Sequence, residues 1–255
     1  LRETISVVTP NKIAATRSFA HYQLLKTTAN KFKSQFLFET NVGAGLPVLS
    51  TLSDLVKSGD RIIKIEAVLS GTLNFIFNNY NAKCSFVEVV KKAKKEGYTE
   101  PDPRLDLSGE DVMRKILILA RESGYQFDFE DVVGNNFLPA NCQITEGEED
   151  FYIKLAANEG YFAKLYHQAT SKSCKLRYVA TFENQKLKTG LSQIGETHPF
   201  YQLEGKDNIV LFYTERYPEQ PLVIKGAGAG AEVTASGCLL YTSDAADEED
   251  SVDLG

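Results

Sequence analysis

The sequence predicts an α/β unit joined to an α+β unit whose helices pack on one face of a largely antiparallel sheet. Near the N-terminus a strand pattern at 5–8 is followed by a loop and a helix that ends near Ala29. In the second half, three strand patterns rich in Tyr, Phe and Val follow one another at 175–182, 186–193 and 209–213. No repeat and no long linker divides the 255 residues.

The composition is that of a globular protein that is weakly acidic. Hydrophobic residues make up 43% of the chain, which is ample material for a core. The net charge of −6 argues against nucleic acid or an anionic membrane as the main partner, because both reward a basic face. Apolar runs such as 116–120 are far too short to span a bilayer. Cys84, Cys142, Cys174 and Cys238 lie far apart without metal-ligand spacing, which favours a reducing cytosol.

The first half of the chain alternates strand and helix patterns. They predict a strand at 35–40, a helix at 46–58, a strand at 62–69, a helix that begins at 70–72 and runs to Tyr80, a helix at 86–95 and a helix that stops at Gly124. Capping boxes of Ser85 with Glu88 and of Ser108 with Asp111 indicate where the last two helices begin.

The second half adds a helix at 151–159 before the three strands, then a strand at 222–225 and a helix that starts near Glu232. Residues 238–255 carry six acidic residues in the last twelve positions and no helical apolar stripe, so we expect them to be disordered or poorly packed. His21, His167 and His198 lack the spacing of a catalytic triad or a zinc site and are interpreted as structural or surface residues.

The densest group of charged residues is GYTEPDPRLDLSGEDVMRK at 97–115. Pro101 and Pro103 bias Glu100 and Asp102 toward extended backbone, so both carboxylates would lie on a stiff arm in front of a helix. A rigid carboxylate array of this kind is typical of a site that holds an ammonium group and passes protons.

On the helix that follows this arm, Asp111 and Lys115 share one face, one turn apart. Taken alone, such a pair is more often an exposed ion pair worth about 0.3–0.5 kcal/mol. The acidic arm beside it favours a catalytic interpretation.

Five motifs occur along the chain in a fixed order: VVTPNK at 7–12, ETNVGAGLPVLS at 39–50, SGTLNFIFNNY at 70–80, the acidic stretch at 97–115 and GAGAGAEVTASG at 226–237. Together they resemble homoserine dehydrogenase, which reduces aspartate 4-semialdehyde to homoserine with a nicotinamide cofactor, in the biosynthesis of threonine, methionine and isoleucine. The segment 182–226 looks more like the form fused behind an aspartate kinase than the free-standing enzyme.

The resemblance implies roles for residues that match the family motifs. Lys115 would be the proton donor, and Asp111 would direct it. The residues implied for substrate binding are Glu100, Tyr98, Thr72, Gly71 and Asp106, with Glu100 on the ammonium group and the helix start at Gly71 and Thr72 on the carboxylate. A plain helix cap at 70–72 is the alternative. Leu105 stands where the family usually has Asp, which puts one secondary polar contact in doubt.

The resemblance also implies a cofactor, NADP or NAD, contacted by Lys12 and Gly230. It further implies a monovalent cation such as sodium, held by the main-chain oxygens of Glu39, Val42, Ala44 and Leu46. Carbonyl ligands leave no side-chain signature, so a tight strand-to-helix turn at this place is an open alternative.

No G-x-G-x-x-G occurs in the sequence, although a nicotinamide enzyme of this kind should carry one near its N-terminus. The resemblance therefore implies that 1–41 is the C-terminal part of a Rossmann-type nucleotide-binding domain whose first half lies upstream. Residues 42–225 would form the catalytic and dimerisation domain, and 226–255 would return to the nucleotide-binding domain with an atypical acidic tail. A homodimer built through the sheet and an aspartate kinase fused upstream are expected partners, and the chain alone should be inactive.

Two other classes stay open. Another semialdehyde or hydroxy-acid oxidoreductase would share the cofactor but should not combine the acidic arm with the helix start at 70–72. A non-catalytic regulatory or interaction module derived from the same fold would explain the absent glycine turn.

Overall fold

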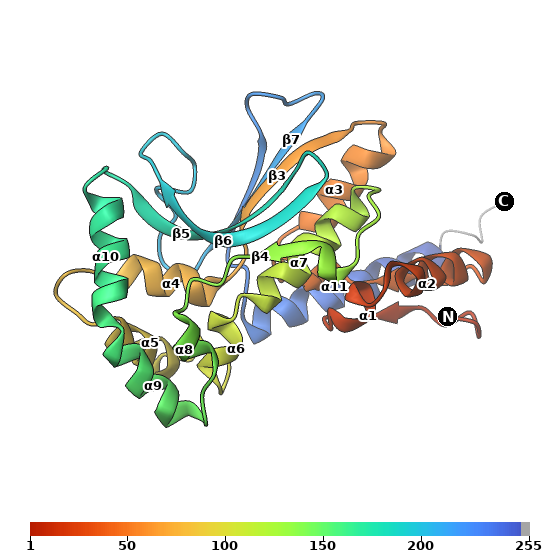
Figure 1. The fold of residues 1–255 in the computed structure, drawn as a ribbon. Helices are drawn as coiled ribbons and strands as arrows, with labels where there is room; N and C mark the ends of the chain where they lie inside the picture. The colour runs from red at the N-terminus through yellow and green to blue at the C-terminus, as the bar shows by residue number, and fades with distance from the viewer. Residues whose placement is uncertain (251–255) are drawn as a thin grey trace.

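A six-stranded sheet organises the molecule (Figure 1). The structure, a computed structural model, describes residues 1–250, with side chains described to residue 240. The strands are β3 (Ile62–Val68), β4 (Val132–Gly134), β5 (Lys175–Glu183), β6 (Lys186–Ile194), β7 (Asn208–Thr214) and β8 (Leu222–Gly226). They lie in the order β4-β6-β5-β3-β7-β8, and every neighbouring pair is antiparallel except β4 with β6. The expected largely antiparallel sheet is confirmed, whereas β4 was not predicted.

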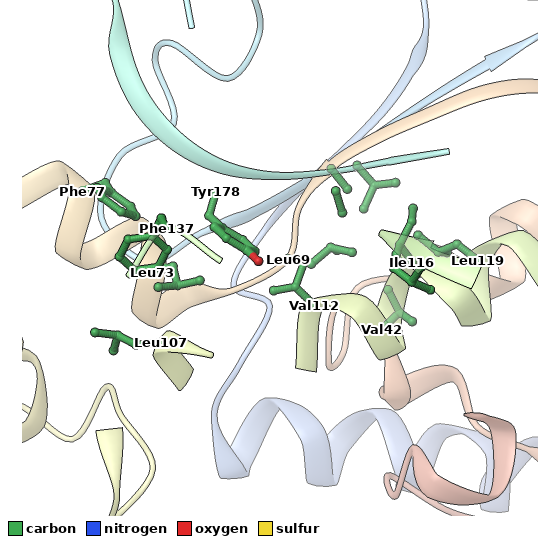
Figure 2. Close-up of a cluster of buried hydrophobic side chains, with 14 of the residues drawn as sticks. Val42, Leu69, Leu73, Phe77, Leu107, Val112, Ile116, Leu119, Phe137 and Tyr178 are labelled. Atoms are coloured by element: carbon green, nitrogen blue, oxygen red, sulfur yellow. The ribbon is translucent and has the colours of Figure 1, made fainter. Parts of the chain in front are cut away.

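The helices of this part gather on one face of the sheet, below it in Figure 1, except α3, which lies at the right and contacts α7. They are α3 (Val48–Lys57), α4 (Gly71–Asn79), α5 (Phe86–Lys95), α6 (Pro103–Leu107), α7 (Glu110–Glu122), α8 (Ala140–Gln143), α9 (Glu148–Ala157) and α10 (Glu159–Thr170), with the 3₁₀ turn η2 (Phe129–Asp131). Helices α4, α7 and α10 contact β5 directly. Figure 2 shows the core between these layers, where Leu69, Ile116 and Tyr178 are buried together. Burial of each large apolar side chain contributes roughly 1.5–3 kcal/mol.

The opposite face of the sheet carries a smaller apolar cluster, because side chains alternate along each strand. Its members are Val68, Val179, Ile194, Phe200, Leu203, Ile209 and Leu211. Arg177 lies on this face, 1% exposed, and donates hydrogen bonds to the carbonyls of Phe200 and Leu203 at 3.0 and 2.9 Å. Burial lowers the pKa of Arg177 to about 10. The arginine thereby fixes part of the connection between β6 and β7 on the sheet.

A second group of elements forms an N-terminal lobe at the far end of the molecule (Figure 1). It contains β1 (Val7–Val8) paired in parallel with β2 (Phe36–Leu37), α1 (Ile13–Thr16), α2 (Phe19–Lys31) and the 3₁₀ turn η1 (Glu39–Asn41). Helix α11 (Ala231–Asp250) returns to this lobe and packs against η1 and β1. The three-part division of the chain stays a prediction.

Several local predictions are wrong. The capping box of Ser108 and Asp111 does not form, because α7 begins after Gly109, whose φ of +76° suits glycine. A Cβ at Gly109 would lie 2.2 Å from the Tyr178 hydroxyl, so packing also demands glycine there. The short helix α6 precedes it, and the single helix expected at 151–159 is the pair α9 and α10.

The acidic C-terminal segment is helical as far as Asp250, so the expected disorder is wrong for that part of the backbone. Leu239 and Leu240 are each 63% exposed, which agrees with poor packing. Residues 251–255 lie outside the described residues. Across the part of the chain that the structure describes, no helix has the length and apolar character needed to cross a membrane.

Candidate active site

A cavity of about 630 Å³ opens between α7, the start of α4 and the N-terminal lobe. All residues assigned above to catalysis, substrate and cofactor line it: Lys12, Gly71, Thr72, Tyr98, Glu100, Asp106, Asp111, Lys115 and Gly230. Leu105 also lines it and is 60% exposed. The structure therefore brings residues from the whole length of the chain to one place, while their roles stay predictions.

Lys115 and Asp111 form the predicted one-turn pair on α7, with 2.9 Å between Lys115 Nζ and Asp111 Oδ2. Lys115 Nζ also donates to the carbonyl of Leu69 at 2.7 Å, and Lys115 is 8% exposed. The other carboxylate oxygen of Asp111 lies 3.1 Å from Lys12 Nζ. Asp111 thus holds two ammonium groups, of which the one from Lys12 was not foreseen.

The charge of Asp111 is set by these two lysines. Burial works to raise the pKa of Asp111, but the ammonium groups of Lys115 and Lys12 outweigh it and lower the pKa to about 2. The carboxylate is therefore ionised at neutral pH and orients the Lys115 ammonium group.

Asp106 ties the acidic arm to the start of α4. Its Oδ2 accepts a hydrogen bond from the Glu100 backbone N–H at 2.8 Å, and its Oδ1 lies 2.9 Å from Thr72 Oγ1. Thr72 Oγ1 also contacts the carbonyl of Tyr98. Burial raises the pKa of Asp106, although the hydrogen bonds from Glu100 and Thr72 act in the opposite direction.

Glu100 is exposed at the cavity wall, and no described side chain forms an ion pair with its carboxylate. Asp102 has the expected extended backbone, but its carboxylate pairs with Arg104 at 2.6 Å. Pro103 already belongs to α6, so the extended arm is shorter than predicted. Of the two carboxylates on the arm, only Glu100 is left available for a ligand.

The start of α4 combines a plain cap with a close backbone approach. Ser70 Oγ accepts a hydrogen bond from Leu73 N–H at 3.1 Å. A Cβ at Gly71 would lie 2.8 Å from the carbonyl oxygen of Lys206, so only glycine fits. The Lys206 ammonium group lies 4.6 Å from the centre of the Tyr98 ring. Sequence reasoning did not include Lys206, and no local pattern marks it.

Arg114 is a second residue that sequence reasoning missed. Its Nη1 donates to Thr16 Oγ1 at 3.2 Å, and Thr16 Oγ1 donates to the Lys12 carbonyl at 2.9 Å. Arg114 also pairs with Glu110 and lines the cavity. Its position three residues after Asp111 could have indicated a shared helix face.

The glycine-rich return loop forms another wall of the cavity. Asn208, which is fully buried, packs against Gly228, where a Cβ would lie 2.1 Å from the asparagine side chain. Asn208 Nδ2 donates to the Gly228 carbonyl at 3.4 Å. Gly230 has a φ of +133°, which glycine tolerates best. The loop therefore needs glycine at both positions.

The segment proposed for a cation lies beside the cavity, and of its four residues Ala44 lines the wall. The carbonyl of Glu39 accepts from Val42 N–H at 3.2 Å, and the carbonyl of Leu46 accepts from Val48 N–H at 2.8 Å. Each carbonyl has a second lone pair, so a hard cation could bind these oxygens without breaking those hydrogen bonds. The Glu39 side chain has a separate structural role, because its carboxylate accepts hydrogen bonds from N–H groups in the first turn of α3.

Side chains alone offer no metal site: the described residues contain no group of three or more His, Cys, Asp or Glu that could hold an ion. His21, His167 and His198 do not line the cavity. His198 Nδ1 accepts from Phe200 N–H at 3.2 Å, which is a structural contact.

Comparisons with known proteins point to one family. The family profile described as homoserine dehydrogenase matches residues 47–240. A bifunctional aspartokinase/homoserine dehydrogenase 2 from Arabidopsis thaliana is 45% identical over 239 residues, which cover 93% of this chain and 26% of the relative. A homoserine dehydrogenase from Paracoccidioides brasiliensis is 42% identical over 248 residues, which cover 93% of this chain and 67% of the relative. The chain thus spans about a quarter of the first relative.

Solved structures with a similar fold include two that differ in their sequence identity to this chain. A Candida auris protein of unknown function is 38% identical, with a TM-score of 0.91, and the match covers 97% of this chain and 71% of that one. A hyperthermophilic archaeal homoserine dehydrogenase in complex with NADPH has a TM-score of 0.72 at 24% identity, over 96% of this chain and 65% of that one. The second likeness shows the fold alone.

Proposed function

Because the chain belongs to the homoserine dehydrogenase family, we propose that it interconverts aspartate 4-semialdehyde and homoserine with NADP or NAD. The observation that carries the proposal is the buried Lys115 ammonium group, directed by Asp111 into a cavity whose wall also bears the available carboxylate of Glu100. The choice of a nicotinamide cofactor rests on the family, whose dehydrogenase reaction needs a hydride carrier.

Lys115 is the residue that donates and accepts the proton. A nicotinamide cofactor, when bound, supplies the hydride for the aldehyde carbon. Lys115 then donates a proton to the developing alkoxide, and in the reverse direction it accepts the proton of the homoserine hydroxyl. Asp111 stays ionised, fixes the direction of the ammonium group and stabilises its charge.

The amino-acid part of the substrate is held at the acidic wall. Glu100 binds the ammonium group as a charge-assisted pair, with Asp106 behind it as the residue that positions the Glu100 backbone. The N–H groups at the start of α4 bind the carboxylate, and Tyr98 closes the site. The Thr72 hydroxyl joins them by turning from the Tyr98 carbonyl and Asp106, its present partners. These contacts hold the aldehyde near Lys115, which is the main contribution of binding to the rate.

Lys12 would contact the nicotinamide end of the cofactor and Gly230 would also contact the cofactor; both lie on the cavity wall. The pyrophosphate would be bound by a glycine turn that these 255 residues do not contain. A monovalent cation at the main-chain oxygens of Glu39, Val42, Ala44 and Leu46 would stiffen the turn between η1 and α3. On the basis of the family resemblance, we also propose that the chain divides into three parts, with boundaries at residues 41 and 225.

The proposed setting is the biosynthesis of threonine, methionine and isoleucine, in a cytosolic or similarly reducing compartment. Four free cysteines support such a compartment. A homodimer through the sheet and a fused aspartate kinase are the proposed partners; the bifunctional relative supports the kinase.

The test is homoserine-dependent reduction of NADP or NAD. It is measured with a chimera in which the part of the Paracoccidioides enzyme that precedes the match is placed before Leu1. Turnover with homoserine, but not with other hydroxy acids, supports the proposal. A chimera that folds and binds NADP yet does not oxidise homoserine would falsify it and favour a non-catalytic module.

A further inference from the structure

A short segment between β6 and β7, residues 203–207, lies against α4, and we call it the β6–β7 strap. Two asparagines of α4 hold it. Asn78 Nδ2 donates to the carbonyls of Leu203 and Gly205, each at 3.1 Å, and Asn74 Nδ2 donates to the carbonyl of Asp207 at 3.1 Å. The strap is therefore fixed by side-chain contacts on both sides of Lys206.

Lys206 is the residue that the strap presents to the cavity wall. Its carbonyl packs against Gly71 so closely that a Cβ there would lie 2.8 Å away. Its ammonium group lies 4.6 Å from the centre of the Tyr98 ring. Gly71 and Tyr98 both line the cavity, so Lys206 contacts its wall at two points, although Lys206 itself is not part of the lining.

Lys206 differs from the basic side chains that line the cavity, because those are all paired with carboxylates. Lys12 and Lys115 both pair with Asp111, and Arg114 pairs with Glu110. Within the described part of the chain, no acidic side chain forms an ion pair with Lys206. The nearby acidic wall, with Glu100 and Asp106, attracts an ammonium group but repels a carboxylate.

We propose that Lys206 is a substrate-binding residue of this chain, whose ammonium group attracts the carboxylate of a zwitterionic amino acid to the start of α4. The inference rests on the proposed function, because it takes the substrate to be an amino acid whose ammonium group is at Glu100. The ring of Tyr98 holds the Lys206 ammonium group in place through a cation–π contact. The ammonium group of the substrate thus faces the carboxylate of Glu100, and the carboxylate of the substrate faces the ammonium group of Lys206.

The experiment compares two ligands by NMR titration of the 255-residue chain: homoserine, and 3-amino-1-propanol, which is homoserine without its carboxylate. Lys206→Met should weaken homoserine binding about 3- to 10-fold at low salt, as expected for a charge partly screened by water. Lys206→Arg should bind homoserine nearly as the parent does. Binding of 3-amino-1-propanol should not weaken in either variant.

The matched control is Lys92→Met. Lys92 lies 5.7 Å from the ring of Phe75, which contacts Tyr98, but it is paired with Glu96 at 3.9 Å. This variant should leave both ligands unaffected. Thermal unfolding of Lys206→Met should match the parent, since Lys206 is exposed.

The outcomes separate the two hypotheses. If the parent chain binds homoserine and Lys206→Met binds it equally well, the inference is wrong and the proposed function stands. Equal weakening of both ligands also overturns the inference, because Lys206 would then act through Tyr98 and not through the carboxylate. If the parent binds neither ligand while it is folded, the substrate site placed at Glu100 and the start of α4 is wrong and the inference falls with it, whereas the proposed function is decided by turnover of the chimera.

Discussion

Lys115 is held in one direction by two partners, the carboxylate of Asp111 and the carbonyl of Leu69. Its side chain is almost fully buried, so its ammonium group cannot turn away from the cavity at low cost. A group fixed in this way contributes mainly to the transition state of proton transfer.

Lys115→Ala in the active chimera should therefore lower kcat about 10²- to 10⁴-fold with little change in the KM for homoserine. Steady-state kinetics measures this, with Lys95→Ala on the exposed face of α5 as the control. If kcat held and KM rose, Lys115 would be a binding residue and the mechanism would be wrong.

For Glu100 the expected effect is on KM, whereas for Lys115 it is on kcat. Glu100→Gln removes the charge that faces the substrate ammonium group, so KM for homoserine should rise about tenfold, the scale of one hydrogen bond to a charged group. Glu96→Gln, which changes an exposed carboxylate of the α5 cap, is the control. An unchanged KM would place the ammonium site elsewhere.

Asp111 should titrate near pH 2, because the ammonium groups of Lys115 and Lys12 lower its pKa from 3.8. Since the folded value lies below the ordinary one, its ion pairs stabilise the fold fully above about pH 4 and are lost as the pH falls through about 2. Carboxyl ¹³C NMR should show Asp111 still ionised at pH 3. In Lys115→Met the pKa should rise, and a titration that is the same in both proteins would mean that Lys115 does not set it.

At the scale of elements, side chains of α7 hold α1 in place through three contacts. Asp111 holds the Lys12 side chain, Arg114 reaches the Lys12 carbonyl through Thr16, and Arg121 Nη1 donates to the Ala15 carbonyl at 2.7 Å. A helix of four residues is not stable alone, so these contacts decide where Lys12 lies.

Arg114→Met and Thr16→Val should each increase amide hydrogen exchange in α1 about 5-fold, as loss of one hydrogen bond implies. The double variant should be no worse than either single one, because both remove the same chain of contacts. Exchange measured by mass spectrometry checks this, and Glu110→Gln, on the other side of Arg114, serves as the control. Additive effects would show that Arg114 and Thr16 act separately.

At the scale of the whole molecule, the cavity lies where two groups of elements meet. The sheet and its helices supply the acidic wall and Lys115, while the N-terminal lobe supplies Lys12. That lobe contains a two-stranded parallel sheet, and around it Ile5, Ile13 and Leu24 are exposed by 66%, 53% and 53%. Parallel strands are normally covered on both faces.

The 255-residue chain alone should therefore show no homoserine-dependent reduction of NADP, while the chimera does. Without a glycine turn the pyrophosphate has no helix start to bind, and most of the affinity that places the nicotinamide is lost. The assay and a direct NADP titration check this together. Turnover by the chain at ordinary cofactor concentrations would show that no further residues are needed.

The sequence by itself determined the features that depend on neighbouring residues. The capping box of Ser85 and Glu88 forms as predicted, and the three antiparallel strands lie where their composition placed them. The one-turn spacing of Asp111 and Lys115 likewise fixed their pairing, because a helix brings residues four apart together wherever it lies.

Only the tertiary structure decided the contacts between distant segments. Lys12 reaches Asp111, and Lys206 reaches Tyr98, across about a hundred residues, so no local pattern could indicate either pair. The same holds for Gly109, where the hydroxyl of Tyr178 and not a serine cap decides how α7 begins. Periodicity and caps act within a turn or a strand, whereas the packing of helices on the sheet sets which distant charges meet in the cavity.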